Sequence, residues 1–523
     1  MAEPSETALA ATAARIERLV LDGDVAEALR LLRETLVAEV GDPHPESVSL
    51  NGGLAWLFDR LSDASPGRAY RQKAIGYAQS ALLLDPEDAL AYAVLPEHET
   101  HLVAHNLLRH RNGARARRIL ERLSPASKSA AQLLALMEFV AMETQRVADL
   151  PRRDPSKPAP LLVNANVWGE SYVDALFAYG FPSLLADGNL PAVSADRDII
   201  VDFYTSAGDR ARIEAHPLTE RVRRLAELRY NILPDGLLAA DGHDAARWCA
   251  GAAQQCSALR AQRVGADLLF LCGSAVYCAG SLRTAYGYLE AGYGAVICMV
   301  PRTLEARTHD ALGRYADIED GVIAAGPQAL SEFIVGNLHG HSLDCFLTDE
   351  ARHVAQNPVA LFFRTEDGFA CRTYEPSPLI ISHKLLKSEF CVDYFTIDVR
   401  FLSELLGTAD YGQAVKPALS PSDGVVVTDV DCYGGPQMRR YGDISLSAAT
   451  SASGALHTAT RVSDIAYFRW ALSQRFSFVA RNSGGSLPPA EVDEADVMDD
   501  LDATIAGGVD AAKRRIAVYE RLR

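Results

Sequence analysis

Apolar residues recur at helical spacing through the first part of the chain. Over residues 6–147 they stand three or four positions apart, so the pattern predicts helices nearly throughout. The Asp22-Gly23-Asp24 break divides a first pair of helices, and a second pair is expected at Ser47–Leu61 and Tyr70–Leu84. Residues 1–148 are therefore expected to form an all-α arm of the helical-repeat type, although a plain helical cap on the rest of the chain fits the pattern equally well.

The pattern changes after residues 149–160, a stretch with four prolines that is typical of a linker. Strand-length apolar runs now alternate with helical patterns. The expected strands are Leu161–Val167, Ile199–Tyr204, Asp267–Leu271, Ala295–Val300, Val359–Phe363 and Val425–Thr428. The expected helices are Tyr172–Leu185, Arg210–Glu227, Asp244–Val264, Leu282–Ala291 and Leu304–Tyr315. This alternation predicts an α/β body over residues 161–445 with a mostly parallel, wrapped sheet, and residues 446–523 are expected to add a loop and C-terminal helices.

Composition narrows the possible functions. The formal net charge of −17 argues against a nucleic-acid binder, because neutralising phosphates needs a basic surface. No apolar run approaches the roughly 18 residues that span a bilayer, and the N-terminus lacks the basic start and apolar stretch of a secretory signal. The nine cysteines are scattered without a C-x-x-C pair, which indicates reduced thiols. We therefore expect a cytoplasmic protein with no membrane span and no nucleic-acid partner.

Several common catalytic motifs are missing from the sequence. It has no G-x-S-x-G elbow, no Walker loop, no G-x-G-x-x-G opening a helix after a strand, and no H-E-x-x-H. Serine hydrolases, P-loop NTPases, dehydrogenases and zinc proteases therefore lack their usual signatures here. A retaining glycosidase with two carboxylates stays open, because such residues need not be close in sequence.

Small and polar residues follow three of the expected strands. The first strand runs into Trp168–Tyr172, the second into Thr205-Ser206, and the third into Cys272-Gly273-Ser274. Because the carboxyl ends of parallel strands meet at one edge of a sheet, these turns could together form a shallow cleft with backbone amides for an anion. Ordinary turn chemistry explains each of them taken singly.

One phrase in the arm resembles a known repeat. The segment Leu84–Tyr92, which reads L-D-P-E-D-A-L-A-Y and follows Ala78, Ala81 and Leu82, resembles the junction between tetratricopeptide repeats. Asp85 is suited to cap the next helix there, and Pro86 to its first turn. The resemblance implies a degenerate tetratricopeptide-like arm that binds a protein partner or acceptor.

The start of the body resembles bacterial glycosyltransferase-like proteins of the GT-A type. The resemblance lies in the W-G-E-x-Y of Trp168–Tyr172, in Phe181–Ala192 and in the strand Asp198–Ser206, and it covers Leu161 to Arg302. It implies a GT-A or Rossmann-like body, a nucleotide-sugar substrate, and Mn²⁺ or Mg²⁺ as the metal. The residues then expected to bind the nucleotide are Trp168, Glu170, Tyr172, Thr205 and Ser274.

The sequence departs from this family at the strand end where GT-A enzymes usually present Asp-x-Asp. Cys272-Gly273-Ser274 stands there, with no carboxylate. An Asp-x-Asp does occur later, at Asp429-Val430-Asp431 after an apolar run, and its two carboxylates are suited to a divalent cation. His383, after another apolar run, is the expected third ligand. Aspartates at strand ends are also common in proteins without a metal there.

The remaining candidates concern proton transfer. Asp398, at the end of an apolar run, is the first candidate for the catalytic base, and Glu366 is the reserve. His339-Gly340-His341 is expected to be a loop rather than a metal site, because it lacks a clear third ligand. The sequence thus predicts a sugar transferase whose arm recognises the acceptor. The alternative is a non-catalytic scaffold that retains the fold, which the missing carboxylate near Ser274 favours.

Overall fold

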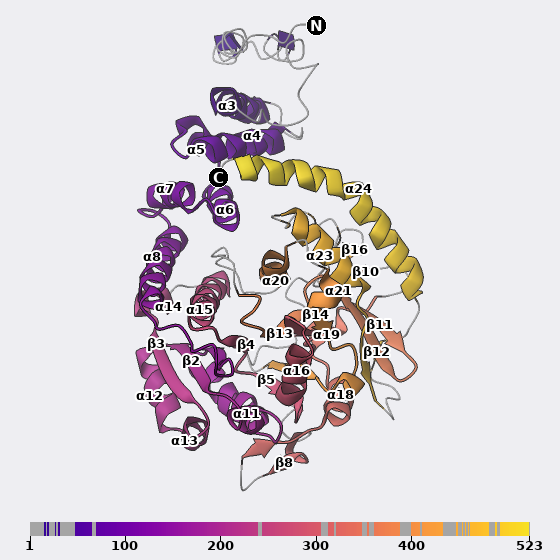
Figure 1. Cartoon of the computed structure of the whole chain (residues 1–523). Helices are drawn as coiled ribbons and strands as arrows, with labels where there is room; N and C mark the ends of the chain where they lie inside the picture. The colour runs from indigo at the N-terminus through magenta and orange to yellow at the C-terminus, as the bar shows by residue number, and fades with distance from the viewer. Residues whose placement is uncertain are drawn as a thin grey trace. The chain divides into compact units, whose positions relative to one another are not determined.

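The computed structural model describes residues 48–64, 70–238, 243–304, 312–317, 321–347, 360–386, 399–407, 410–431, 461–480 and 492–521, and a few isolated positions outside these ranges. The chain divides into two compact units (Figure 1). One contains residues 1–138 and 517–523, and the other, the body, contains residues 139–516. No helix among the described residues is long and apolar enough to cross a membrane.

The continuous described stretches of the first unit consist of helices and the turns that connect them. Its helices are α3 (Val48–Ala64), α4 (Tyr70–Leu84), α5 (Ala89–Val94), α6 (Glu97–Arg109), α7 (Gly113–Leu123) and the first part of α8 (Lys128–Ala148). The predicted capping at the α4–α5 junction takes a different form, because Asp88 and not Asp85 is the N-cap. The Asp88 carboxylate accepts the backbone N–H of Ala91 at 2.7 Å. Most of the first predicted helix pair lies outside the described residues.

A seven-stranded sheet forms the centre of the body. In spatial order its strands are β3 (Glu227–Ile232), β2 (Ile199–Thr205), β1 (Leu161–Asn166), β4 (Asp267–Leu271), β13 (Ser377–Ile381), β6 (Ala295–Cys298) and β14 (Val415–Pro417). The first four strands are parallel to one another, and so are β6 and β14. Only β13 runs against its neighbours β4 and β6. The predicted mixed α/β architecture with a mostly parallel sheet is therefore confirmed.

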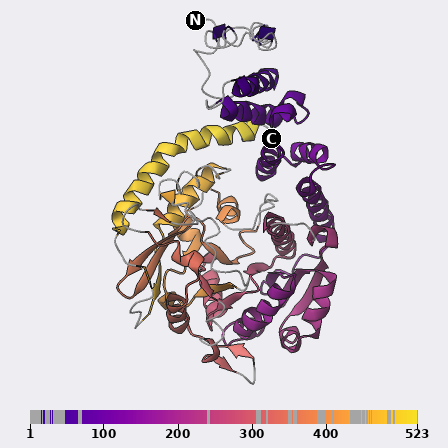
Figure 2. The same ribbon diagram turned by 180° about the vertical axis from the view of Figure 1, so that it is seen from behind.

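Helices cover both faces of this sheet (Figures 1 and 2). Successive strand residues point to opposite faces, so Leu161 and Val163 belong to one apolar cluster while Leu162 belongs to another. The first cluster includes residues of α9 (Glu170–Ala175), α11 (Leu190–Ser194) and α16 (Ser281–Glu290). The second includes residues of α15 (His243–Val264), α18 (Pro327–Gly336) and α23 (Val462–Ser473). Burial on both faces explains why the central strands are continuous apolar runs.

Smaller sheets surround the main one. One contains β5 (Ala275–Tyr277), β15 (Val427–Asp431) and β7 (Arg302–Leu304), and another contains β11 (Ala360–Thr365), β12 (Gly368–Thr373) and β17 (Phe476–Val479). Short pairs are β8 (Ala316–Asp317) with β9 (Val322–Ile323) and β10 (His353–Val354) with β16 (Leu446–Ser447). Two of the predicted strands, now β11 and β15, thus lie outside the main sheet. The body ends in α24 (Glu494–Arg521), as far as Ile516.

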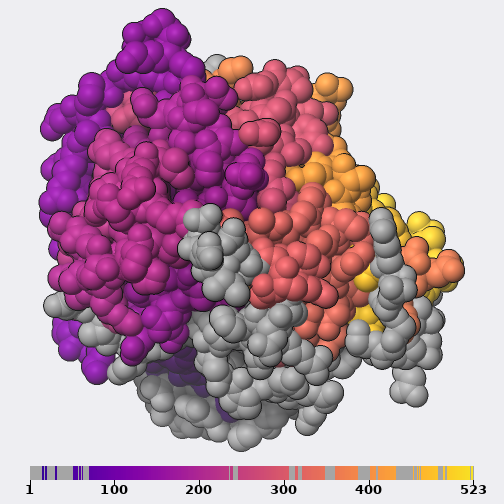
Figure 3. Space-filling view, turned by 90° about the horizontal axis from the view of Figure 1, so that it is seen from below, coloured from indigo at the N-terminus to yellow at the C-terminus, as the bar shows by residue number. Residues whose placement is uncertain are grey.

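The helix predicted over residues 210–227 proves to be three elements. They are α12 (Ala207–Ala215), α13 (Pro217–Arg223) and the start of β3. The break falls at His216, which is extended, and at Pro217, which has no N–H to continue the α12 ladder. Figure 3 shows the face seen from below, where the magenta surface of earlier body residues and the coral surface of later ones both appear.

Candidate functional site

The order of the strands indicates where a ligand would bind. The chain passes from β1 to β2 on one side, and later returns to place β4 on the other side of β1. In such sheets the crevice outside the carboxyl ends of the strands at this switch point is the usual ligand site. The residues that follow β1 and β4 are therefore the first place to look for chemistry.

A tight turn follows β1. Gly169 has φ 84°, a left-handed conformation that favours glycine, and its N–H donates to Asp209 Oδ2 at 2.8 Å. Asp209 stands in the first turn of α12 and also accepts the Ser206 hydroxyl at 2.7 Å. These bonds join the ends of β1 and β2. Trp168 is half-buried beside this turn, and α9 begins directly after it.

The loop after β4 packs tightly against the helix that follows β1. An added Cβ at Gly273 would lie 3.3 Å from the carbonyl oxygen of Tyr172. A Cβ at Gly180 would lie only 2.6 Å from the carbonyl oxygen of Gly273. The backbone of Cys272-Gly273-Ser274 therefore lies against Tyr172, and two of the predicted nucleotide-binding residues, Tyr172 and Ser274, belong to one neighbourhood.

The strand β15 brings a carboxylate to this loop. It pairs with β5, which directly follows the loop, and the Ser274 hydroxyl donates to Asp429 Oδ1 at 2.5 Å. Cys272 Sγ lies 3.7 Å from the same oxygen, and Arg302 Nε lies 3.5 Å from Asp429 Oδ2. The carboxylate that the sequence lacks at the end of β4 is thus present in space, supplied by a residue more than 150 positions later.

The second aspartate of the pair has a histidine partner. His339 Nε2 lies 3.4 Å from Asp431 Oδ2. The other ring nitrogen, Nδ1, accepts the backbone N–H of His341 at 3.1 Å and caps the short helix α19 (Gly340–Leu343). Because Nδ1 is an acceptor there, the neutral ring carries its proton on Nε2 and donates it toward Asp431. The His339-Gly340-His341 motif, expected to be a loop, therefore reaches the site from a helix cap.

Two side chains of this cluster have shifted acidities. Burial, assisted by Arg302, lowers the pKa of His341 to about 4, so this imidazole is neutral at pH 7. Desolvation and the Asp429 carboxylate raise the pKa of Cys272 to about 12, although part of the residue is exposed to solvent. The thiol therefore remains protonated and is a poor nucleophile at neutral pH.

From the sequence alone, no role was assigned to Arg302, His339 or His341. The register pairs Arg302 of β7 with Asp429 of β15, which no local pattern around Pro301 indicates. His339 did carry a signal, because it belongs to a noticed H-x-H motif. Its partner Asp431 could not be identified from spacing, since 92 residues separate the two in the chain.

The structure separates His383 from the aspartate pair. Because β13 is antiparallel, its carboxyl end meets the amino end of β4, where the His383 N–H donates to Asp267 Oδ1 at 2.8 Å. His383 Nδ1 lies 2.8 Å from the same oxygen. The length of β4, about 16 Å at 3.3 Å per residue, then lies between His383 and the Cys272 loop. His383 cannot share a ligand with Asp429 in this arrangement.

The other predicted residues are dispersed. Thr205 is fully buried, and its carbonyl accepts the Leu233 N–H, so it does not line an open surface. Glu170 is exposed and pairs with Arg212 at 3.3 Å. Glu366 is exposed in the turn between β11 and β12, outside the sheet that holds Asp429. Asp398 lies outside the described residues.

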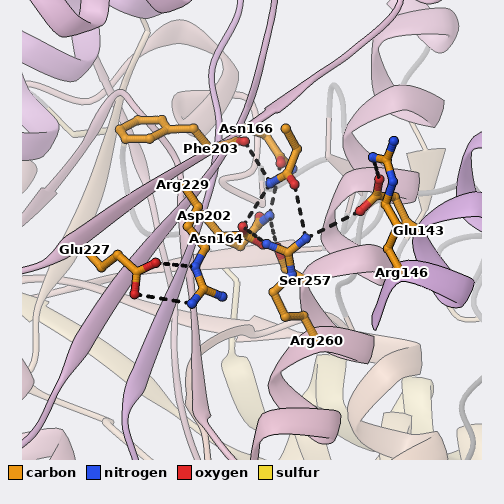
Figure 4. A network of polar contacts seen from close by, with 11 residues as sticks. Glu143, Arg146, Asn164, Asn166, Asp202, Phe203, Glu227, Arg229, Ser257 and Arg260 are labelled. Atoms are coloured by element: carbon orange, nitrogen blue, oxygen red, sulfur yellow. Dashed lines mark hydrogen bonds and ion pairs between the residues drawn. The ribbon is translucent and has the colours of Figure 1, made fainter. Parts of the chain in front are cut away.

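A second polar cluster lies inside the body, where Figure 4 shows it closely. Asp202, at 0% exposure in β2, accepts Arg260 Nη1 at 2.6 Å, the Ser257 hydroxyl at 2.9 Å and Asn231 Nδ2 at 2.9 Å. Arg260 Nη2 also reaches Glu143 of α8 at 3.4 Å. Burial raises the pKa of Asp202, and Arg260 opposes that rise. The charged groups of this cluster are buried and bind one another, so we interpret the cluster as structural.

The implied metal does not fit the described side chains. Among them no group of three His, Cys, Asp or Glu residues is placed to hold a metal ion. Asp429 already receives the Ser274 hydroxyl and faces the Arg302 guanidinium, a cation that would repel another. Both ring nitrogens of His339 are engaged. The described side chains therefore do not form a site for a divalent cation.

The comparisons with known proteins give matches among solved structures alone. No protein-family model matches the sequence, and no curated protein matches it. Among solved structures, the chain is similar to the mannosyltransferase PcManGT from Pyrobaculum calidifontis, determined in complex with GDP-Man and Mn²⁺. The two share 14% identity over 77% of this chain and 92% of that one, with a TM-score of 0.23. A score of this size is too low for the neighbour's ligands to be transferred to this chain.

Proposed function

We propose that the body transfers a sugar from a nucleotide-sugar donor to a hydroxyl of an acceptor. The observation that carries the proposal is the meeting of Ser274 and Asp429 at the carboxyl end of β4, beside the switch point of a mostly parallel sheet. The resemblance of residues 161–302 to GT-A proteins makes that strand end the place for a carboxylate. Asp429 supplies it from a different strand.

In this proposal the ends of β1 and β4 hold the donor. Trp168 and Tyr172, both half-buried, offer ring surface to the nucleotide base, and the backbone of the Gly273 loop approaches the phosphates. Ser274 keeps Asp429 oriented by its hydrogen bond. The N-terminal helices would contact the acceptor, as the tetratricopeptide-like junction at Leu84–Tyr92 implies.

The chemistry needs a group that takes one proton. The acceptor oxygen forms a bond to the anomeric carbon, the bond from that carbon to the diphosphate oxygen breaks, and the acceptor proton passes to a base. Among the described carboxylates Asp431 is the best placed, because His339 orients it and its side chain is 15% exposed. Asp398 remains the base predicted from the sequence.

The test separates binding from turnover. The full chain is titrated calorimetrically with UDP, GDP, CMP and dTDP, and then incubated with the sugar derivatives while release of the nucleotide is measured. We expect one nucleotide class to bind, and Asp431→Asn to slow release by about 10²–10⁴-fold with little change in affinity, as for loss of a general base. The matched control is Glu366→Gln, an exposed carboxylate in a turn of another sheet.

A non-catalytic scaffold is the second candidate. It is favoured by Cys272-Gly273-Ser274 at the strand end, where the family presents acidic residues, and by the burial of Thr205. Binding of one nucleotide class without turnover in any sugar derivative would favour the scaffold. The absence of binding with all four classes would refute the transferase proposal.

A further inference from the structure

We infer that the site binds the donor diphosphate through its own cationic side chains, with Arg302 acting at the place where a divalent ion would act. This inference rests on the proposed function and adds to it the means of charge neutralisation. A nucleoside diphosphate leaving group carries negative charge that some positive group must balance. The side chain placed to do so in the described part of the site is an arginine.

Hydrogen bonds and strand pairing fix the backbone of Arg302 at the site. Its N–H donates to the Ser342 hydroxyl at 2.9 Å, and its carbonyl accepts the His339 N–H at 2.9 Å. The pairing of β7 with β15 sets its Cα directly beside that of Asp429. The Nε atom lies 3.5 Å from Asp429 Oδ2, and the side chain remains 41% exposed. A guanidinium has five N–H donors in a planar fork, so one that faces a carboxylate through Nε can also donate to a phosphate.

Charged side chains of both signs lie in the described part of the site. Asp429 and Asp431 supply two negative charges, and Arg302 and Arg247 are both close enough to depress the pKa of His341. His341 itself is neutral at pH 7 because of its burial. A divalent cation bound to Asp429 would face the Arg302 guanidinium, whereas metal sites for hard cations collect oxygen ligands with excess negative charge. A diphosphate instead meets the exposed Arg302.

The uncharged side chains of Cys272 and Ser274, which follow β4, are consistent with an arginine in place of a metal ion. Where a metal would need two carboxylates, Ser274 donates a hydrogen bond to Asp429 Oδ1 and Cys272 Sγ lies 3.7 Å from the same oxygen. Both side chains therefore serve to hold Asp429, and Asp429 in turn holds Arg302.

The experiment compares affinity with and without metal. The nucleoside diphosphate that binds is titrated into the full chain in EDTA, in Mg²⁺ and in Mn²⁺. We expect dissociation constants within about threefold of one another, and Arg302→Gln to weaken binding in EDTA by about 10- to 100-fold, the usual cost of a charge-assisted hydrogen bond. Arg302→Lys should restore part of the affinity, since it keeps the charge without the planar fork.

Arg475→Gln is the matched control. Its arginine is 43% exposed and pairs with Glu494 at 3.0 Å, which resembles the exposure and pairing of Arg302, but it lies beside the β11–β12–β17 sheet. Its affinity should equal that of the wild type. Binding that appears only with Mg²⁺ or Mn²⁺, or an unchanged affinity in Arg302→Gln, would overturn the inference and leave the proposed function standing. Failure to bind under every condition would instead refute the proposed function.

Discussion

The buried cluster around Asp202 gives the sharpest prediction for stability. Replacing Asp202 by Ala leaves the Arg260 guanidinium, 10% exposed, without its partner at 2.6 Å, and also removes the acceptor for Ser257 and Asn231. Removal of one partner from a buried ion pair costs about 3–5 kcal/mol, because the remaining charge stays desolvated. Glu143, at 3.4 Å from Arg260, compensates in part. We therefore expect a loss of about 3 kcal/mol in the free energy of unfolding.

The free energy of unfolding of the Arg260→Met variant should depend on pH differently from that of the wild type. The variant buries Asp202 without its cation, and burial then raises the pKa of this carboxyl above its unfolded value. Below the unfolded pKa the carboxyl is protonated in both states and no charge is buried. As the pH rises from the unfolded pKa toward the folded pKa, the carboxyl ionises in the unfolded state while it stays protonated in the folded state. This difference stabilises the unfolded state relative to the folded one. Arg260→Met should therefore be less destabilised at pH 4.5 than at pH 8, relative to the wild type at the same pH.

Urea unfolding of the full chain, followed by circular dichroism, measures both effects. Glu227→Ala is the matched control, because Glu227 and Arg229 form an exposed pair at 2.7 Å on the neighbouring strand (Figure 4). Exposed pairs contribute about 0–1 kcal/mol. The double variant Asp202→Ala/Arg260→Met should cost less than the sum of the two single changes. Additive costs, or a loss in Asp202→Ala no greater than in the control, would refute the assignment of Asp202 and Arg260 as a coupled buried pair.

Two further predictions concern the loop after β4. Gly180→Ala should destabilise the body, because the new Cβ would lie 2.6 Å from the Gly273 carbonyl oxygen. Gly287→Ala, on the exposed face of α16, places a Cβ with nothing within 4 Å and should stabilise the body by about 0.5–1 kcal/mol. Thermal unfolding of both variants checks these expectations. With its pKa near 12, Cys272 should react with iodoacetamide at pH 8 about 10²-fold more slowly than a model thiol, as peptide mapping would measure. Asp429→Asn should accelerate the reaction by removing a charge that raises this pKa, and an unchanged rate would contradict that contribution.

The central strands could be predicted because they are buried on both faces. Leu161–Val167, Ile199–Tyr204 and Asp267–Leu271 differ from β1, β2 and β4 by at most one residue at an end. The edge strand β3 escaped prediction, since Glu227–Ile232 is exposed or half-buried along its length and has no apolar run. An edge strand contacts only one neighbour, so its sequence carries less of the pattern that burial imposes.

The candidate site was predictable only in part, because its contacts join distant segments. The aspartates of β15 were noticed from their position after an apolar run, and Ser274 from its place after β4. Their meeting depends on the pairing of β15 with β5, which local spacing does not encode. Arg302 and His339 depend on the same small sheet and on the cap of α19. Chemistry assembled by long-range pairing requires the fold to be known first.

The direction of one strand decides what His383 can do. An apolar run has the same appearance whether its strand runs parallel or antiparallel to its neighbours. The prediction that His383 shares a ligand with Asp429 therefore placed it at the wrong edge of the sheet. At the opposite edge it joins three segments: its N–H and Nδ1 contact Asp267 at the start of β4, its Nε2 lies 3.4 Å from Arg153 of the proline-rich segment, and Arg197 lies 3.7 Å from Asp267. Because β13 runs against β4, its carboxyl end lies at the edge opposite the Cys272 loop, and His383 contacts Asp267 there instead of the aspartates of β15.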